Sequence, residues 1–305
     1  MRIEKGPGIG VISRLLKKVE ASPVLPQLGD LSREDAVAVV VLARAVGYGL
    51  GAGIAGVWGS LARLAGEGRL STRLFLDAGP RRAWEVLEEA GAPRMGDPHI
   101  RSRLLYDVAY KVDRLYSASF YNIVVESRGM LLFRGEGFVE RLEDFAAYRA
   151  PARSKAYRAA LDLHLIGVLP VHDLWNARVP VDAGLVSFAI RSCALIVDDE
   201  LLEYIAAGLP LDRETDSLLR WATAIVLDEA SSRARLNPFQ AYHKLKALEE
   251  ACSPSSPALA GECTRECRLL GLCMDSRCLL EECCASSLPA VRVPPPKPPA
   301  ESWWD

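Results

Sequence analysis

Apolar residues recur at helical spacing along most of the chain, and residues that favour helix starts precede several of these runs. The segment Ser32 to Asp35 has a capping composition and opens an apolar run that ends near Ala45. Two further runs open at Gly79-Pro80 and at Asp97-Pro98, where proline suits the first turn of a helix. The pattern predicts an all-α protein.

The remaining predicted helices share this periodicity and fill most of the chain. They cover a segment with Trp58, Leu61 and Leu64, and residues 137–148, 154–166, 182–197, 201–207, 214–228 and 238–251. The helices 137–148 and 154–166 form a pair joined by a short turn at 149–153. Only residues 123–125 and 131–133 are candidates for short strands.

The composition is that of a soluble globular protein, with half of the 305 residues hydrophobic and a quarter charged. The longest apolar stretch, 36–46, is too short to span a bilayer, and the N-terminus does not resemble a signal peptide. We therefore expect a cytoplasmic protein with no membrane partner. Only three Asn and two Gln occur, which is a thermophile tendency.

Charge is distributed unevenly along the chain, although its net value is −2. Residues 1–160 carry 24 Lys and Arg against 18 Asp and Glu, whereas residues 161–305 carry 13 against 21. A basic N-terminal part is compatible with binding a phosphate backbone. A solvated basic face is the alternative interpretation.

Seven of the eight cysteines follow residue 250, and a proline-rich end follows them. We divide the chain into a helical domain at 1–250, a Cys-rich segment at 251–287 and an extended Pro-rich tail at 288–305. Closely spaced thiols in an intracellular chain favour a metal or an iron–sulfur cluster, with zinc and disulfides as alternatives. The best four ligands are Cys252, Cys263, Cys267 and Cys273.

Two charged residues mark neighbouring helix starts. Asp182 follows the turn at Pro180 and opens an apolar helix, where the helix dipole favours a carboxylate. Lys155 lies near the start of the helix at 154–166. A lysine and an aspartate at two helix starts form the active site of several DNA glycosylases. The alternatives are an N-cap for Asp182 and a surface lysine for Lys155.

Four segments together resemble the archaeal 8-oxoguanine DNA glycosylases, a branch of the helix-hairpin-helix DNA glycosylase superfamily. They occur in the family's order over residues 30–230. They are Tyr48-Gly49-Leu50 with Trp58, Ala152-Arg153-Ser154-Lys155, Val179-Pro180-Val181-Asp182 with Ser192 to Ile196, and Asp216 to Leu219. The resemblance implies a two-lobed helix-hairpin-helix glycosylase-like fold with a cleft between the lobes, followed here by a Cys-rich C-terminal segment.

The resemblance also implies an activity and its residues. It implies a bifunctional DNA glycosylase and abasic-site lyase, acting as a monomer on double-stranded DNA that contains an oxidised purine such as 8-oxoguanine. Its residues are Lys155 as Schiff-base nucleophile, Asp182 as catalytic carboxylate, Trp58, Asp216 and Trp221 for the flipped base, and Arg149, Arg153 and Arg158 for phosphates. The cysteine order resembles a stretched form of the loop that binds a 4Fe-4S cluster in endonuclease III-type glycosylases.

The chain departs from the family at several positions. The hairpin before Lys155 lacks glycines, and Asp162 replaces the family's second lysine. Arg220 stands where a tryptophan is expected, and Trp221 is displaced by one residue, a rotation of about 100° on a helix. A rival function is a non-catalytic nucleic-acid-binding protein with a metal-binding tail, and for Trp58 a core position is an equal alternative.

Overall fold

The computed structural model describes residues 2–23, 28, 30–48, 54–94 and 96–251, and it confirms the all-α prediction for them. The α-helices are α1 (Gly8–Lys18), α2 (Arg33–Val46), α3 (Ile54–Gly66), α4 (Thr72–Ala78), α5 (Ala83–Glu89), α6 (Pro98–Leu115), α7 (Tyr121–Ser127), α8 (Phe138–Leu142), α9 (Ser154–Leu165), α10 (Ala183–Arg191), α11 (Asp199–Ala206), α12 (Arg213–Arg233) and α13 (Pro238–Ala251). Short 3-10 helices are η2 (Ala146–Tyr148), η3 (Pro151–Arg153) and η4 (Leu174–Asn176), and the strands are β1 (Ile3–Lys5) and β2 (Leu195–Val197). The cysteines 252, 263, 267 and 273 and the Pro-rich tail lie outside the described residues.

The described chain forms two compact units. One unit contains residues 2–23 and 177–251, and the other contains the described residues from 28 to 176. Each unit has its own core of apolar helix faces. Lys155 belongs to the second of these units and Asp182 to the first.

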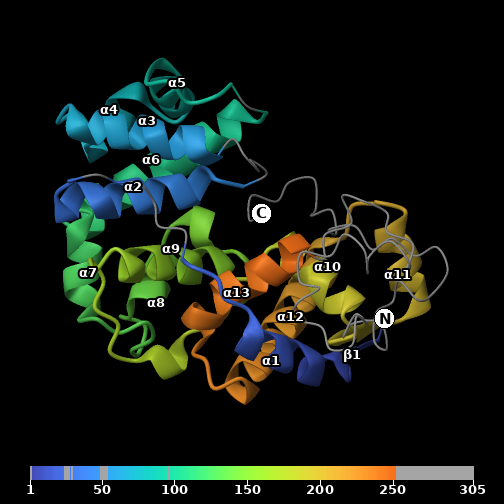
Figure 1. Cartoon of the computed structure of the whole chain (residues 1–305). Coiled ribbons are helices and arrows are strands. Elements are labelled where there is room, and N and C mark those ends of the chain that lie inside the picture. Colours follow the sequence, from blue (N-terminus) through green and yellow to red (C-terminus); the bar gives the residue numbers. More distant parts are fainter. Residues whose placement is uncertain (1, 24–27, 29, 49–53, 95, 252–305) are drawn as a thin grey trace. The chain divides into compact units, whose positions relative to one another are not determined.

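Helix α2 forms the centre of the unit built from residues 28–176. It packs against α3, α6 and α9 (Figure 1). Its residues from Ala36 to Val46 are buried, with Arg44 as the partly exposed exception. A helix that is apolar on all sides is a core helix, so a charged residue within it needs a partner. The Ser32 hydroxyl accepts a hydrogen bond from the Asp35 N–H at 3.1 Å, which confirms the predicted cap.

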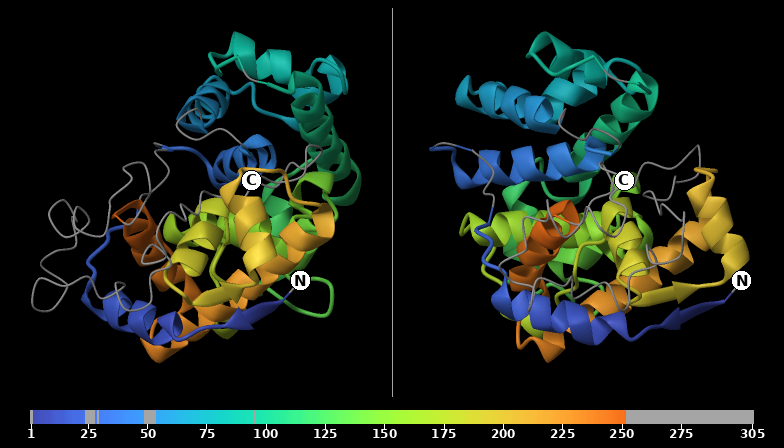
Figure 2. Two further views of the ribbon diagram at one scale, coloured as in Figure 1. Left: turned by 90° about the vertical axis from the view of Figure 1, so that its right-hand side faces the viewer. Right: turned by 45° about the vertical axis from the view of Figure 1, so that its right-hand side comes forward.

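Helix α12 is central to the other unit, where it packs against α1, α10 and α13. Strands β1 and β2 pair antiparallel, with Ile3 opposite Val197, as the blue and yellow arrows in Figure 2 show. The predicted helix 182–197 is therefore wrong at its C-terminal end. Helix α10 ends at Arg191, and Cys193 then adopts a left-handed φ of 52°, which breaks the helix before β2.

The two predicted strands are also wrong, because residues 123–125 lie in α7 and residues 131–133 form a bend. The helix at 123–125 has a tertiary cause. The Glu34 carboxylate of α2 accepts hydrogen bonds from the N–H groups of Phe120 and Tyr121, at 2.7 and 2.9 Å. These N–H groups start α7, and an acceptor there stabilises the helix against the strand preference of its β-branched residues.

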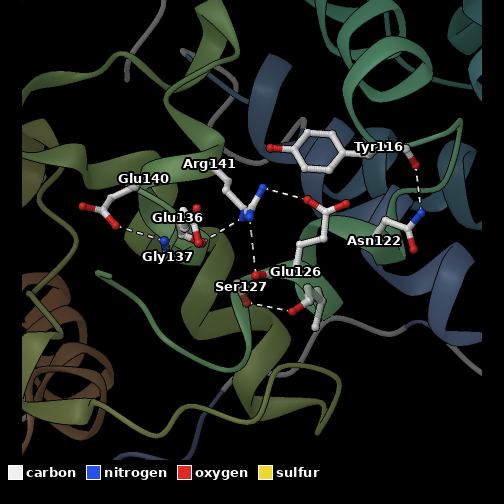
Figure 3. A network of polar contacts seen from close by, with 9 residues as sticks. Tyr116, Asn122, Glu126, Ser127, Glu136, Gly137, Glu140 and Arg141 are labelled. Carbon is white, nitrogen blue, oxygen red and sulfur yellow. Dashed lines mark hydrogen bonds and ion pairs between the residues drawn. The ribbon is translucent and has the colours of Figure 1, made fainter. Parts of the chain in front are cut away.

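A polar network joins α7 to α8 across the loop between them (Figure 3). The Arg141 guanidinium donates to a carboxylate oxygen of Glu126 and to the carbonyl of Glu136, both at 2.8 Å. The Glu140 carboxylate accepts from the Gly137 N–H at 3.0 Å at the start of α8. These bonds satisfy backbone groups at the end of the loop that leads into α8.

The predicted helix pair around the hairpin is confirmed for α9, whereas the first helix is shorter than predicted. It comprises α8, which ends at Leu142, and the separate turn η2. Two residues before α9, Ala152 and Arg153, have left-handed φ values of 55° and 54°. Left-handed backbone costs about 1–2 kcal/mol for a residue with a side chain, so packing around the turn has to offset this cost.

Arg128 tests this backbone cost at an exposed site. It follows the last residue of α7 with a φ of 54°, a position that favours glycine. We expect Arg128→Gly to raise the free energy of unfolding by about 1 kcal/mol in a urea titration. Arg114→Gly, at an exposed position in the last turn of α6, should lower it by about 1 kcal/mol. Equal effects of the two substitutions would contradict a backbone cost at Arg128.

Candidate functional site

Lys155 is a buried amine at the start of α9. The residue is 8% exposed, and its Nζ donates to the Ala45 carbonyl at 3.2 Å. Ala45 lies in the last turn of α2, where a cation is favourable. The unfavourable position of a lysine at one helix start is thus offset by the C-terminal end of another helix. Lys155 is therefore not the surface lysine of the alternative interpretation.

Tyr48 lies beside this amine. Its ring centroid is 5.1 Å from Lys155 Nζ and 4.1 Å from the Arg101 guanidinium carbon. Arg101 is held by the carbonyls of Val46 and Tyr48. Among the described residues, the buried Tyr48 hydroxyl has no hydrogen-bond partner. Burial raises the pKa of Tyr48, against the opposing effect of Arg101, so the phenol is neutral and can donate.

Tyr48 belongs to the first of the four sequence segments, but that segment predicts no role for its side chain. Its environment depends on Arg101, which lies 53 residues further along the chain. No local pattern around Tyr48 indicates that contact. The glycine-rich composition after Tyr48 is the one nearby signal, and it does not identify the hydroxyl.

A row of charged residues follows one face of α9. Lys155, Arg158 and Asp162 are spaced three and then four residues apart, which places them on the same side of a helix. Asp162 is fully buried and pairs with Arg44 Nε at 2.6 Å and Arg158 Nε at 3.2 Å. Asp162, which occupies the position of the family's second lysine, thus joins α9 to α2 through an ion pair.

Trp58 is partly exposed, and the Arg44 guanidinium carbon lies 5.1 Å from its ring centroid. This contact is a cation–π interaction that occupies one face of the indole. A base can therefore stack only on the face that Arg44 leaves open. The partial exposure of Trp58 is compatible with both the stacking role and the core position.

The three arginines predicted to bind phosphates all have partners within the protein. Arg149 donates from Nε to the Glu143 carbonyl at 3.1 Å. Arg153 binds the Glu143 carboxylate with two nitrogens, at 3.0 and 2.9 Å. Arg158 pairs with Asp162. A phosphate contact by Arg153 or Arg158 would therefore have to compete with a carboxylate.

Asp182 is the N-cap of α10, which confirms that alternative for its local role. One carboxylate oxygen accepts the Leu185 N–H at 2.9 Å, and the other binds Lys246 Nζ at 2.9 Å. Lys246 also pairs with Glu249 at 2.6 Å. Partial desolvation raises the pKa of Asp182, whose side chain is 41% exposed, but Lys246 and the Leu185 N–H outweigh it and hold the pKa below its ordinary value. The carboxylate is ionised at neutral pH.

The two roles of Asp182 in stability can be separated by substitution. We expect Asp182→Ala to lower the free energy of unfolding by about 0.5–2 kcal/mol through loss of the cap, whereas asparagine keeps a capping oxygen. Since the folded pKa is depressed, the charge contribution is present above pH 4 and lost as the pH falls through the folded pKa. The wild-type advantage over Asp182→Asn should therefore shrink in urea titrations below pH 4. A constant advantage would contradict the depressed pKa.

Asp216 lies in the core, whereas Trp221 lies at the surface. Asp216 is 1% exposed, and Arg220 Nε lies 3.1 and 2.9 Å from its two carboxylate oxygens. Trp221 is 44% exposed. The displacement of tryptophan by one residue thus puts an arginine in the core and the indole at the surface. Asp216 can read a base only if Arg220 releases it.

The described residues contain neither a metal-binding cluster nor a membrane-spanning helix. No group of three or more His, Cys, Asp or Glu side chains there could hold a metal ion. Among the helices of those residues, none combines the length and apolar character needed to cross a membrane.

In comparisons with known proteins, the chain matches no family model and no curated protein. The glycosylase resemblance therefore stays a prediction.

Proposed function

We propose that the protein is a bifunctional DNA N-glycosylase and abasic-site lyase that removes an oxidised purine from double-stranded DNA. The observation that supports it most is the Lys155 amine, which is 8% exposed at the start of a helix directly after a strained turn. A nucleophile has to be a neutral amine, so the ammonium held by the Ala45 carbonyl and the Tyr48 ring has to lose its proton before it attacks. The order of the sequence motifs supplies the reaction class.

In the proposed reaction, the damaged nucleotide is extruded from the duplex. Lys155 Nζ attacks C1′ of the sugar, the bond from C1′ to the base breaks, and the base leaves with the bonding electrons and takes up a proton. Ring opening then gives a Schiff base between Nζ and C1′. Loss of a C2′ proton breaks the C3′–O bond and cleaves the strand. The ionised Asp182 would stabilise positive charge on the sugar.

Tyr48 fits this proposal as a contact to the extruded nucleotide. Its hydroxyl is a neutral donor whose bonding capacity is not used by the described residues. A buried polar group without a partner costs free energy, and a ligand that accepts its hydrogen bond regains it. Trp58 would stack on the base with the face that Arg44 leaves open.

The proposed cofactor is a 4Fe-4S cluster on Cys252, Cys263, Cys267 and Cys273. These residues lie outside the described part, and no step of the reaction involves the cluster. Iron and zinc analysis of the purified protein, together with its visible spectrum, distinguishes the cluster from zinc and from disulfides.

An incision assay on a panel of duplexes tests the function. The panel contains 8-oxoguanine, other oxidised bases, uracil, an abasic site and undamaged DNA. We expect incision at the oxidised purine and at the abasic site, and loss of both in Asp182→Asn. Binding to duplexes without incision of any substrate would contradict the proposal and support the non-catalytic alternative.

A further inference from the structure

Arg44 is the one charged residue between Ala36 and Val46 of the core helix α2, and its side chain is 20% exposed. Its Nε is fixed by the fully buried Asp162 at 2.6 Å, and its guanidinium carbon lies 5.1 Å from the Trp58 ring centroid. Among the described residues, neither terminal nitrogen of Arg44 has a hydrogen-bond partner. The guanidinium is therefore held on one side and available on the other.

From this geometry we infer that Arg44 forms the centre of a binding site for a phosphate group. An arginine that pairs through Nε retains four N–H groups on its two terminal nitrogens, and this planar fork matches the oxygens of a phosphate. Anchoring by Asp162 and Trp58 removes part of the entropy that a long side chain loses on binding. An ordinary surface arginine has neither support.

The local charge also favours an anion. Arg44 and Arg158 share the single carboxylate of Asp162, and Lys155 lies on the same face of α9. Among the described residues, Arg44 therefore has only a share of one carboxylate to balance its charge. By contrast, Arg153 and Glu143 neutralise each other one to one. A partly buried guanidinium whose charge is only partly balanced is stabilised when an anion binds.

A phosphate balances the charge of Arg44 more fully than a carboxylate does. A phosphate monoester carries close to two negative charges near neutral pH, and it offers three acceptor oxygens. The group can come from a free nucleotide or from the DNA backbone. A backbone diester carries one negative charge and two non-bridging oxygens, but it still presents a pair of oxygens to the planar fork. The inference does not depend on the proposed chemistry of Lys155, because binding requires no turnover.

The test follows the side-chain Nε–Hε resonance of Arg44 and the indole N–H of Trp58 by NMR in the full-length chain. The ligands are inorganic phosphate, thymidine 5′-monophosphate and an undamaged DNA duplex, each compared with sodium chloride at equal ionic strength. We expect both resonances to shift in a saturable way with phosphate but not with chloride. Arg44→Met should weaken phosphate binding by at least about tenfold, the loss of a charge-assisted pair.

Two variants keep the result decisive. Arg33→Met removes one charge from the exposed first turn of the same helix and should leave the affinity within about twofold. Arg44→Lys preserves a cation for Asp162 but lacks the planar fork, so it should fold and bind phosphate several-fold more weakly. If Arg44→Met does not fold, Arg44→Lys decides.

The outcomes separate the sources of the ligand. Shifts with the duplex alone assign the site to the DNA backbone, and shifts with the small phosphates alone assign it to a nucleotide. No saturable shift with any ligand, or equal weakening in Arg33→Met, overturns the inference. Phosphate binding by a protein that incises no DNA leaves the inference intact while the proposed function fails.

Discussion

Borohydride reduction should trap the wild-type protein covalently on a duplex with an abasic site, and Lys155→Met should give no adduct. Methionine fills a similar volume but has no amine, so no Schiff base can form. We expect incision at the same site to fall by at least about 10³-fold, as loss of a nucleophile does in other enzymes. Gel analysis of the trapped complex and single-turnover incision measure the two effects.

Lys244→Met is the matched control for this experiment. Lys244 also donates its Nζ to a carbonyl near the C-terminal end of a helix, that of Leu16 in α1 at 2.9 Å. Both substitutions should lower the free energy of unfolding by about 1.5–3 kcal/mol, because each removes a hydrogen bond between a charged group and a carbonyl. The control should nevertheless keep full trapping. An adduct that persists in Lys155→Met would remove Lys155 from the proposed reaction.

Asp162→Ala should lower the free energy of unfolding by about 3 kcal/mol, within the range of about 3–5 kcal/mol for breaking a buried ion pair. Asp162 is fully buried, and its removal leaves Arg44 and Arg158 without their carboxylate. Both arginines are 20% exposed, so water offsets part of the loss and the lower end of the range applies. Urea titration of the full chain measures the change.

An exposed ion pair provides the comparison for Asp162. Glu67 and Arg69 pair at 3.0 Å with side chains 45% and 59% exposed. Glu67→Ala should cost about 0–1 kcal/mol, since water already screens this pair. Asp162→Asn should fall between the two, because it keeps an acceptor oxygen but no charge. A cost below 1 kcal/mol for Asp162→Ala would show that the pair does not stabilise the contact between α2 and α9.

Local sequence signals predicted the helices well where the signal lies within a few residues. Ser32 and Asp182 cap α2 and α10 as their side chains indicate, and Pro98 begins α6. The strand predictions were wrong because strands depend on contacts between residues far apart in the chain. Pairing of Ile3 with Val197 joins residues far apart in the chain, and the Glu34 carboxylate that starts α7 comes from another helix.

The candidate site divides in the same way. The residue types and the order of Lys155, Asp182 and Asp216 are readable from the sequence, and they suggest the reaction class. Their ion-pairing partners are not readable. Arg220 follows Asp216 by one helical turn, a spacing that is compatible with an ion pair. Only the tertiary structure shows that both side chains are buried and paired with each other. Lys246 reaches Asp182 across 64 residues.

The sequence by itself determined that the chain is helical and where most of its helices begin, because capping and apolar periodicity act over one or two turns. Only the tertiary structure decided which charged and polar side chains are paired within the protein and which can still bind a ligand. It enclosed Asp162 between two arginines, put Lys155 at the end of α2, and left the Tyr48 hydroxyl and the Arg44 fork unused by the described residues. Burial and pairing depend on contacts between distant segments, and these contacts give each charged residue its role.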